Sequence, residues 1–210
     1  MRISGDKICA VLNKVRILRE HLERECANKQ GPVVSPTDVH WAVEQVYALT
    51  IEMVEVAFEA SHFYGKVERY KDSRARVLVR SNLSDDMKRL VAVKELCHLA
   101  IDEQDDWSTL GLETIRGLMD EWRLLRENGE GHQNPADPLV SEMLAEIAAI
   151  EIMYPMHFRD ADLAKLDAND TTIKQIALEH EIPAAAIETA LDHHEILSEA
   201  WAKIENASKT

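Results

Sequence analysis

One stretch of this chain departs from an otherwise helical hydrophobic pattern. After Tyr64, apolar and charged residues alternate in KVERYK and RARVLVR, and Asp72-Ser73 separates the two runs. Alternation with a period of two is typical of strands, and a short polar connection joins the strands of a hairpin. The sequence therefore predicts a β-hairpin at about 66–80 within a predominantly helical chain, which is the α+β class.

Helical periodicity precedes the hairpin. We expect one helix over 8–26, then a loop, and a second helix over about 39–62 that Ser35 and Pro36 would open. The second helix is apolar on more than one face. It is therefore expected at the centre of the fold.

Helices also follow the hairpin. Asn82 or Ser84, with the acidic pair Asp85-Asp86, would open a helix that runs through LVAVKELCHLAI. A polar stretch at 127–138 is typical of a surface loop, and Pro155 would stop the helix before it. The remaining helices are expected at about 112–126, 139–153, 160–167, 171–181 and 184–205.

The composition indicates a folded chain without a large phosphate-binding surface. The 210 residues are 46% hydrophobic, and 24 Lys and Arg face 38 Asp and Glu, giving a formal net charge of -14. This charge opposes nucleic-acid binding, which needs a basic surface. No apolar run approaches the roughly 20 residues of a membrane span. The cysteines, Cys9, Cys26 and Cys97, lack a paired metal spacing. We expect a cytoplasmic protein that contacts neither nucleic acid nor membrane.

The helix after the hairpin carries the sequence KELCH at 94–98. It differs by one residue from the HExxH signature of zinc peptidases, in which two histidines on one helix face bind the metal and the glutamate is the general base. Glu95 and His98 occupy the positions of the glutamate and the second histidine. Lys94 occupies the position of the first histidine, so one ligand position is changed.

A further ligand has to come from a separate element, because one helix cannot surround a tetrahedral ion. The predicted helix at 139–153 offers Glu142 and Glu146 on one face, beside small alanines that allow close packing. The order of hairpin, KELCH helix and this helix resembles the ImmA/IrrE family of zinc metallopeptidases over about residues 65–195. The family's segment R..F..AHELGH is similar to DDMKRLVAVKELCHLAID, and its motif E..A..FA..LL.P is similar to Glu142, Ala145, Ala148, Ala149, Ile152, Met153 and Pro155.

Carried over position by position, the resemblance implies a role for each site residue. Glu95 would be the general base, His98 a zinc ligand and Glu142 the carboxylate ligand. The fold implied is a zincin-like core, in which a small β-hairpin or sheet packs on a helical bundle, followed by a C-terminal helical pair. The chain departs from the family at Lys94, and at Ala148 where the family has Phe.

The resemblance also suggests a division of the chain. Residues 1–34 would form an N-terminal helix and loop, 35–157 the zincin-like core with the hairpin, and 158–210 a C-terminal helical region. The interval from His98 to the second motif is long for the family. It implies an inserted helix at about 112–126.

Lys94 decides what such a site can bind. An ammonium repels a metal ion, and ligation by the neutral amine requires a strongly lowered pKa. Our hypothesis is that the Lys94 ammonium takes the electrostatic place of the metal, between Glu142 and Glu95. Carboxylates arranged around a dication would otherwise stay unpaired at high cost. On this hypothesis the chain has no cofactor, whereas a functional site would hold zinc.

Two functions follow from the resemblance. The expected one is a non-catalytic ImmA/IrrE-like protein that acts by binding another protein. The family implies a helix-turn-helix transcription regulator as partner, in the control of phage, mobile-element or stress genes. The alternative is an active zinc metallopeptidase that cleaves such a regulator, with Glu95 activating water and His98 and Glu142 holding the ion. An oligomer is compatible with either function.

Other interpretations of the KELCH helix stay open. It could be a plain amphipathic helix with Lys94 in solvent. His98, Asp102 and Glu142 could form a mixed metal site. Glu59 to His62 has the same ExxH spacing as KELCH, and pairs of ExxH motifs on helices bind two irons in carboxylate-bridged bundles.

The C-terminal residues at 171–191 are typical of a helix-turn-helix. This segment has one basic residue, Lys174, against three glutamates, so it offers phosphate little and favours a packing or protein-binding role. The cluster Asp-His-His-Glu at 192–195 suggests a metal site. Consecutive helical residues point about 100° apart, however, so a solvated face is expected there.

Overall fold

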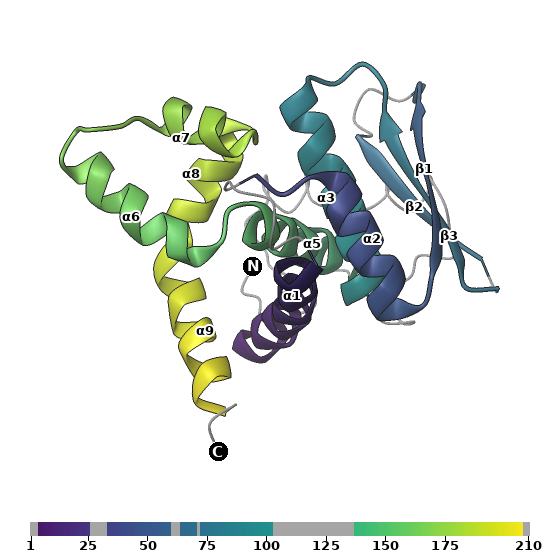
Figure 1. Ribbon diagram of the computed structural model, residues 1–210, viewed down its shortest axis with the longest axis horizontal. Helices are drawn as coiled ribbons and strands as arrows, with labels where there is room; N and C mark the ends of the chain where they lie inside the picture. The colour runs from purple at the N-terminus through teal and green to yellow at the C-terminus, as the bar shows by residue number, and fades with distance from the viewer. Residues whose placement is uncertain (1–3, 26–32, 60–63, 71, 103–136, 208–210) are drawn as a thin grey trace, which may run out of the picture.

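The computed structural model describes residues 4–25, 33–59, 64–70, 72–102 and 137–207. Within these ranges the chain is predominantly helical with one small sheet, as the α+β prediction requires (Figure 1). The helices are α1 (Gly5–Glu25), α2 (Pro36–Tyr47), α3 (Asp85–Ile101), α5 (Asp137–Met153), α6 (Met156–Asp167), α7 (Ile173–His180), α8 (Ala184–Asp192) and α9 (His194–Ala207), and the strands are β1 (Thr50–Val56), β2 (Gly65–Arg69) and β3 (Arg74–Arg80).

The predicted hairpin is confirmed, and it belongs to a three-stranded sheet. β2 and β3 pair antiparallel, with Gly65 opposite Val79, and the turn contains Ser73 in the left-handed region at a φ of 59°. β1 pairs in parallel with the other side of β3, with Thr50 opposite Arg74, so the strand order is β1-β3-β2. Helices α2 and α3 lie on one face of this mixed sheet (Figure 1).

The predicted helix over 39–62 is wrong beyond Tyr47. Its start is as expected, since Ser35 and Asp38 form a reciprocal capping box. The helix ends at Ala48, whose φ of 51° is left-handed and whose N–H donates to the carbonyl of Glu44. The next residues, TIEMVEV, form β1 instead, because β-branched side chains suit a strand and β3 supplies the backbone partners.

Helices α1, α3 and α5 pack together and bury most of the apolar core (Figure 1). The predictions at 8–26 and 139–153 are confirmed by α1 and α5, and the helix opened near Ser84 is confirmed by α3. The helix predicted at 112–126 and most of the loop predicted at 127–138 lie outside the described residues. Among the described helices, none is long and apolar enough to cross a membrane.

The C-terminal region contains α6 to α9 on the side of the molecule away from the sheet (Figure 1). The single helix predicted at 184–205 is wrong, because α8 ends before His193 and α9 begins at His194. The His193 N–H donates to the carbonyls of Thr189 and Leu191, which closes α8. The change of direction lets Leu197 and Ala200 reach the core.

One buried ion pair joins this region to α5. The guanidinium of Arg159 on α6 lies 2.6 Å from Glu151 Oε1, and both side chains are almost completely buried. Arg159 also donates to the carbonyl of Tyr154, and Trp201 Nε1 on α9 donates to Glu151 Oε2 at 3.0 Å. Three helices therefore meet at one charged pair.

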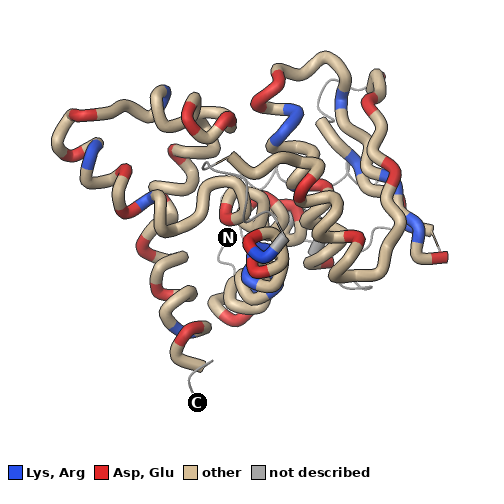
Figure 2. Tube along the Cα trace, in the orientation of Figure 1, with Lys and Arg blue, Asp and Glu red and all other residues tan. Residues whose placement is uncertain are grey.

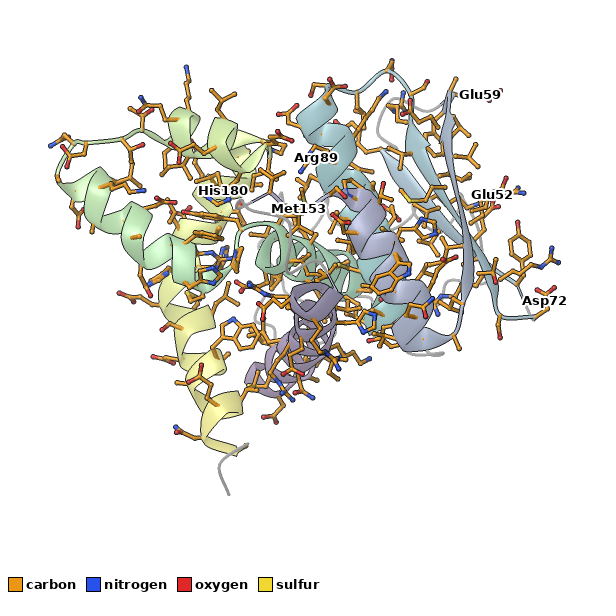
Figure 3. The ribbon with its side chains drawn as sticks, viewed as in Figure 1. Glu52, Glu59, Asp72, Arg89, Met153 and His180 are labelled. Carbon is orange, nitrogen blue, oxygen red and sulfur yellow. The ribbon has the colours of Figure 1, made fainter. Side chains whose placement is uncertain are left out.

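A second polar link lies at the N-terminal end of α3. Arg89 forms an ion pair with Glu181 at 3.0 Å and donates to the carbonyls of Glu181 and Val34. It lies between α3 and the α7–α8 turn in Figure 3. Arg89 thus connects the core to the helix pair that resembles a helix-turn-helix.

Candidate functional site

The candidate site lies where α3 and α5 face each other. From Val91 to Ile101 every side chain of α3 is buried except Lys94, which is partly exposed. On α5 the facing residues Ala145, Ala148 and Ala149 are almost fully buried, and their small side chains let the two helices approach closely. This packing brings Glu142, at the exposed edge of α5, over the KELCH segment.

Lys94 is held by carboxylates. Its Nζ lies 2.5 Å from Glu142 Oε2 and 3.5 Å from Glu95 Oε1, and 24% of its side chain is exposed. Burial alone would lower the pKa of Lys94, but the charges of Glu95 and Glu142, with a smaller contribution from Glu146, raise it. Lys94 is therefore a charged ammonium at neutral pH, and it is not in open solvent as a plain amphipathic helix would have it.

His98 is held from both sides of its ring. Nδ1 lies 2.9 Å from Asp102 Oδ2 and 3.2 Å from Ser141 Oγ, and the Ser141 hydroxyl donates to Asp102 Oδ1 at 2.7 Å. Nε2 faces Glu142 Oε1 at 3.4 Å. Burial opposes the charged ring, but the hydrogen bond to Asp102 and the carboxylate of Glu142 facing Nε2 outweigh it and raise the pKa of His98 to about 9.

Glu142 is shared by the two cations. One oxygen contacts Lys94 and the other faces His98. Partial burial would raise the pKa of Glu142, but His98 and Lys94 lower it to about 2. Because 54% of the side chain is exposed, water screens these contacts, and the carboxylate gains less stability from them than a buried ion pair would.

Glu95 is covered by the sheet. Only 5% of its side chain is exposed, and burial raises its pKa despite the nearby Lys94 and His98 charges. The first residue of β2, Gly65, lies directly against it: a Cβ at Gly65 would be 2.7 Å from Glu95 Cγ and Oε1, and equally close to Val91 Cγ1. The strand therefore covers this carboxylate on the side that faces the sheet.

A Gly65→Ala substitution tests this contact. The added methyl would overlap Glu95 and Val91, so β2 or α3 must move, and overpacking of this kind costs about 1–3 kcal/mol. We expect that loss in urea unfolding. Gly5→Ala is the matched control, because a Cβ there meets nothing within 4 Å. If Gly65→Ala and Gly5→Ala changed the free energy of unfolding equally, β2 would not be in close contact with Glu95.

Zinc does not fit this donor set. A zinc site of this type needs three protein ligands, and here the first position presents an ammonium 2.5 Å from the carboxylate that would bind the ion. His98 could ligate only after losing the proton that its pKa of about 9 favours. Among the described residues, no group of three or more His, Cys, Asp and Glu has a geometry suited to a metal.

The mixed site and the di-iron site are also disfavoured by the geometry. Asp102 contacts Nδ1 of His98 whereas Glu142 faces Nε2, so the three do not converge on one point. Glu59 lies in a bend beyond the end of β1, and not on a helix (Figure 3). Its partner His62 lies outside the described residues.

The C-terminal histidines His193 and His194 contact different residues. His193 Nδ1 contacts the Thr189 carbonyl at 2.8 Å, whereas His194 Nε2 lies 3.3 Å from Asp160. The two rings therefore do not form one cluster. Figure 2 shows acidic positions spread along α6 to α9 with few basic ones, which agrees with the charge argument against a DNA-binding helix pair.

The pKa of His98 predicts a pH dependence of stability. The folded pKa of about 9 lies above the ordinary histidine value of 6.5, so the stabilising contribution is complete below pH 6.5 and is lost as the pH rises to 9. We expect the difference in unfolding free energy between the wild type and His98→Gln to shrink by about 3 kcal/mol over this interval. Urea titrations at several pH values would measure it.

Asp102→Asn provides the control for that experiment. The hydrogen bond to Asp102 is the largest influence raising the His98 pKa, so its loss should move the decline toward lower pH. If the difference in unfolding free energy between the wild type and His98→Gln did not vary with pH, the assigned charge of His98 would be contradicted.

Two residues of the site, Ser141 and Gly65, have no signal in the sequence. Asp102 is expected from the sequence only as a metal ligand, although its spacing of four residues from His98 also predicts a direct contact with that ring.

No protein-family model matches the sequence, and no curated protein matches it either.

Proposed function

We propose that this chain is a non-catalytic relative of the ImmA/IrrE peptidases in which an internal ion pair has replaced the metal. The observation that carries the proposal is the contact of Lys94 Nζ with Glu142 Oε2, at the position where the first zinc ligand would face the last. A cation is thereby supplied by the chain itself to carboxylates that would otherwise lie together unpaired.

The arrangement of elements supports descent from a zincin-like core. The hairpin strands precede α3, α3 carries Glu95 and His98, and α5 brings Glu142 to them across a close helix contact. These are the residues and the order on which the sequence resemblance rests. The contacts of Glu142 with both Lys94 and His98 are the feature of this arrangement that the proposed origin accounts for.

The environment of Glu95 supports the loss of catalysis. A general base must reach the proton that it abstracts, directly or through one water. Glu95 is buried, its pKa is raised, and its carboxylate is in contact with Lys94 and is covered by Gly65. In this position it acts as a partner of the lysine and not as an activator of water.

With no reaction to perform, the chain acts by binding a protein. The family resemblance points to a helix-turn-helix regulator in the cytoplasm, and the net charge of -14 favours a partner with a basic surface. Association with such a regulator should slow as salt is added, because screening weakens electrostatic steering. An association rate that ignores ionic strength would remove the electrostatic part of the proposal.

A gain of metal binding tests the proposed origin of the site. Lys94→His would restore the two-histidine, one-glutamate ligand set, so this variant should bind one zinc per chain in equilibrium dialysis. Lys94→Gln is the matched control, since it removes the ammonium without adding a ligand, and it should bind none. A folded Lys94→His protein that takes up no zinc would refute descent from a metal site. Cleavage of a regulator by the wild type would favour the active-peptidase alternative.

A further inference from the structure

His98 is oriented in the way that a metal-ligating histidine needs. Such a ligand binds metal through one ring nitrogen and donates the other N–H to a carboxylate, which fixes the ring and its tautomer. Here Nδ1 contacts Asp102 at 2.9 Å and leaves Nε2 directed at Glu142. Nε2 is buried and makes no hydrogen bond with acceptable geometry to any described residue.

Asp102 is itself fixed by a residue of the opposite helix. Ser141 Oγ donates to Asp102 Oδ1 at 2.7 Å, while Asp102 Oδ2 contacts the ring. The two carboxylate oxygens thus have separate partners, one on α5 and one on α3. Because Ser141 directly precedes Glu142, one turn of α5 both holds the carboxylate behind the ring and supplies the carboxylate in front of it.

We infer that Asp102 and Ser141 are positioning residues that preserve the orientation of a histidine metal ligand after the metal itself has been replaced. The inference rests on the proposed origin of the site and extends it to residues outside both sequence motifs. In the wild type the pair holds the ring so that His98 and Lys94 share Glu142. In a chain with histidine at 94, the same pair would hold Nε2 ready for zinc.

Cobalt binding to the Lys94→His protein tests the inference. Three proteins are compared, carrying Lys94→His alone, with Asp102→Asn, or with Ser141→Ala, and Co²⁺ is titrated while its visible absorption is recorded. Asp102→Asn should weaken binding by about 10–100-fold, the usual effect of removing such a partner. Ser141→Ala should weaken it less. The matched control is Asp160→Asn, which alters the separate Asp160–His194 contact and should leave affinity unchanged.

The possible failures are distinguishable. If Lys94→His binds Co²⁺ and Asp102→Asn leaves both affinity and spectrum unchanged, the positioning inference is wrong and the proposed origin survives. If folded Lys94→His binds no Co²⁺, the proposed origin itself is wrong. Thermal melts of every variant show whether a loss of affinity reflects unfolding.

A second measurement needs no metal. In the wild type the Nδ1 proton of His98, held by Asp102 in a buried position, should exchange slowly enough with water to be observed by NMR. In Asp102→Asn its exchange should be at least about tenfold faster, because the charge-assisted hydrogen bond is lost. An Nδ1 proton that is equally protected in both proteins would overturn the assignment of Asp102.

Discussion

Replacing Arg159 with Met is expected to lower the free energy of unfolding by about 3–5 kcal/mol, the usual cost of removing one partner of a buried ion pair. The Glu151 carboxyl would lose its ion-pair partner at a position with 1% exposure, and among the described residues only Trp201 Nε1 would remain as a side-chain donor to it. Because Arg159 joins α6 to α5, the C-terminal helices should also become more sensitive to limited proteolysis. Chemical unfolding and a protease time course would measure both effects.

A double variant separates the pair from its surroundings. Arg159→Met combined with Glu151→Leu removes both charges, so the double variant should be more stable than Arg159→Met alone. Arg16→Met is the exposed control: Arg16 contacts Glu20 at 2.7 Å and both side chains are exposed, so its loss should matter little. If Arg159→Met behaved like Arg16→Met, the buried pair would not be what attaches this region.

The second large effect is expected at Lys94. Lys94→Met would leave Glu95 buried beside Glu142, with His98 as the one remaining cation among the described residues around them, and we expect a loss of about 2–3 kcal/mol. This is less than for Arg159, because Lys94 is partly exposed and Glu142 is half exposed. Urea unfolding at pH 7 measures the loss. Lys66→Met, which removes a surface partner of Glu68 at 2.9 Å, is the matched control and should change stability much less.

The loss at Lys94 should depend on pH with a defined sign. Burial already raises the folded pKa of Glu95, and losing the ammonium would raise it further, so the variant is penalised as the pH rises and partly recovers when Glu95 takes up a proton in acid. The difference from the wild type should therefore be smaller at pH 5 than at pH 8. A difference that grew on acidification would mean that Lys94 does not neutralise these carboxylates.

Local patterns were sufficient for the elements whose stability is local. The alternation of RARVLVR and the polar pair Asp72-Ser73 specify a hairpin, and the small residues of α5 specify a close helix contact. The strand β1 was not predictable in this way, since Ile51, Val54 and Phe58 recur at the i, i+3, i+7 spacing of a helix face, although Thr50–Val56 is a strand. Pairing with β3, in which Thr50 lies opposite Arg74, makes this segment a strand. That contact is distant in sequence, so no local pattern reveals it.

The site also combines residues that local sequence patterns predict with contacts that are distant in sequence. The KELCH spacing and the glutamate of α5 predict Lys94, Glu95, His98 and Glu142 as site residues, because each lies in a motif with a chemical reason for its spacing. Ser141 reaches Asp102 across 39 residues of chain, and Gly65 reaches Glu95 from the sheet. Neither contact has a local pattern, so only the packing of α3 against α5 and β2 reveals them.

The zinc content of the unmodified protein tests the central claim most directly. The claim is that the Lys94 ammonium has taken the place of the ion beside Glu142. Protein produced with zinc in the medium, dialysed and analysed for metal should retain no stoichiometric zinc, and added zinc should not change its melting temperature. One zinc per chain that is lost on Glu142→Gln would contradict the claim, because it would mean that the lysine yields this position to the metal.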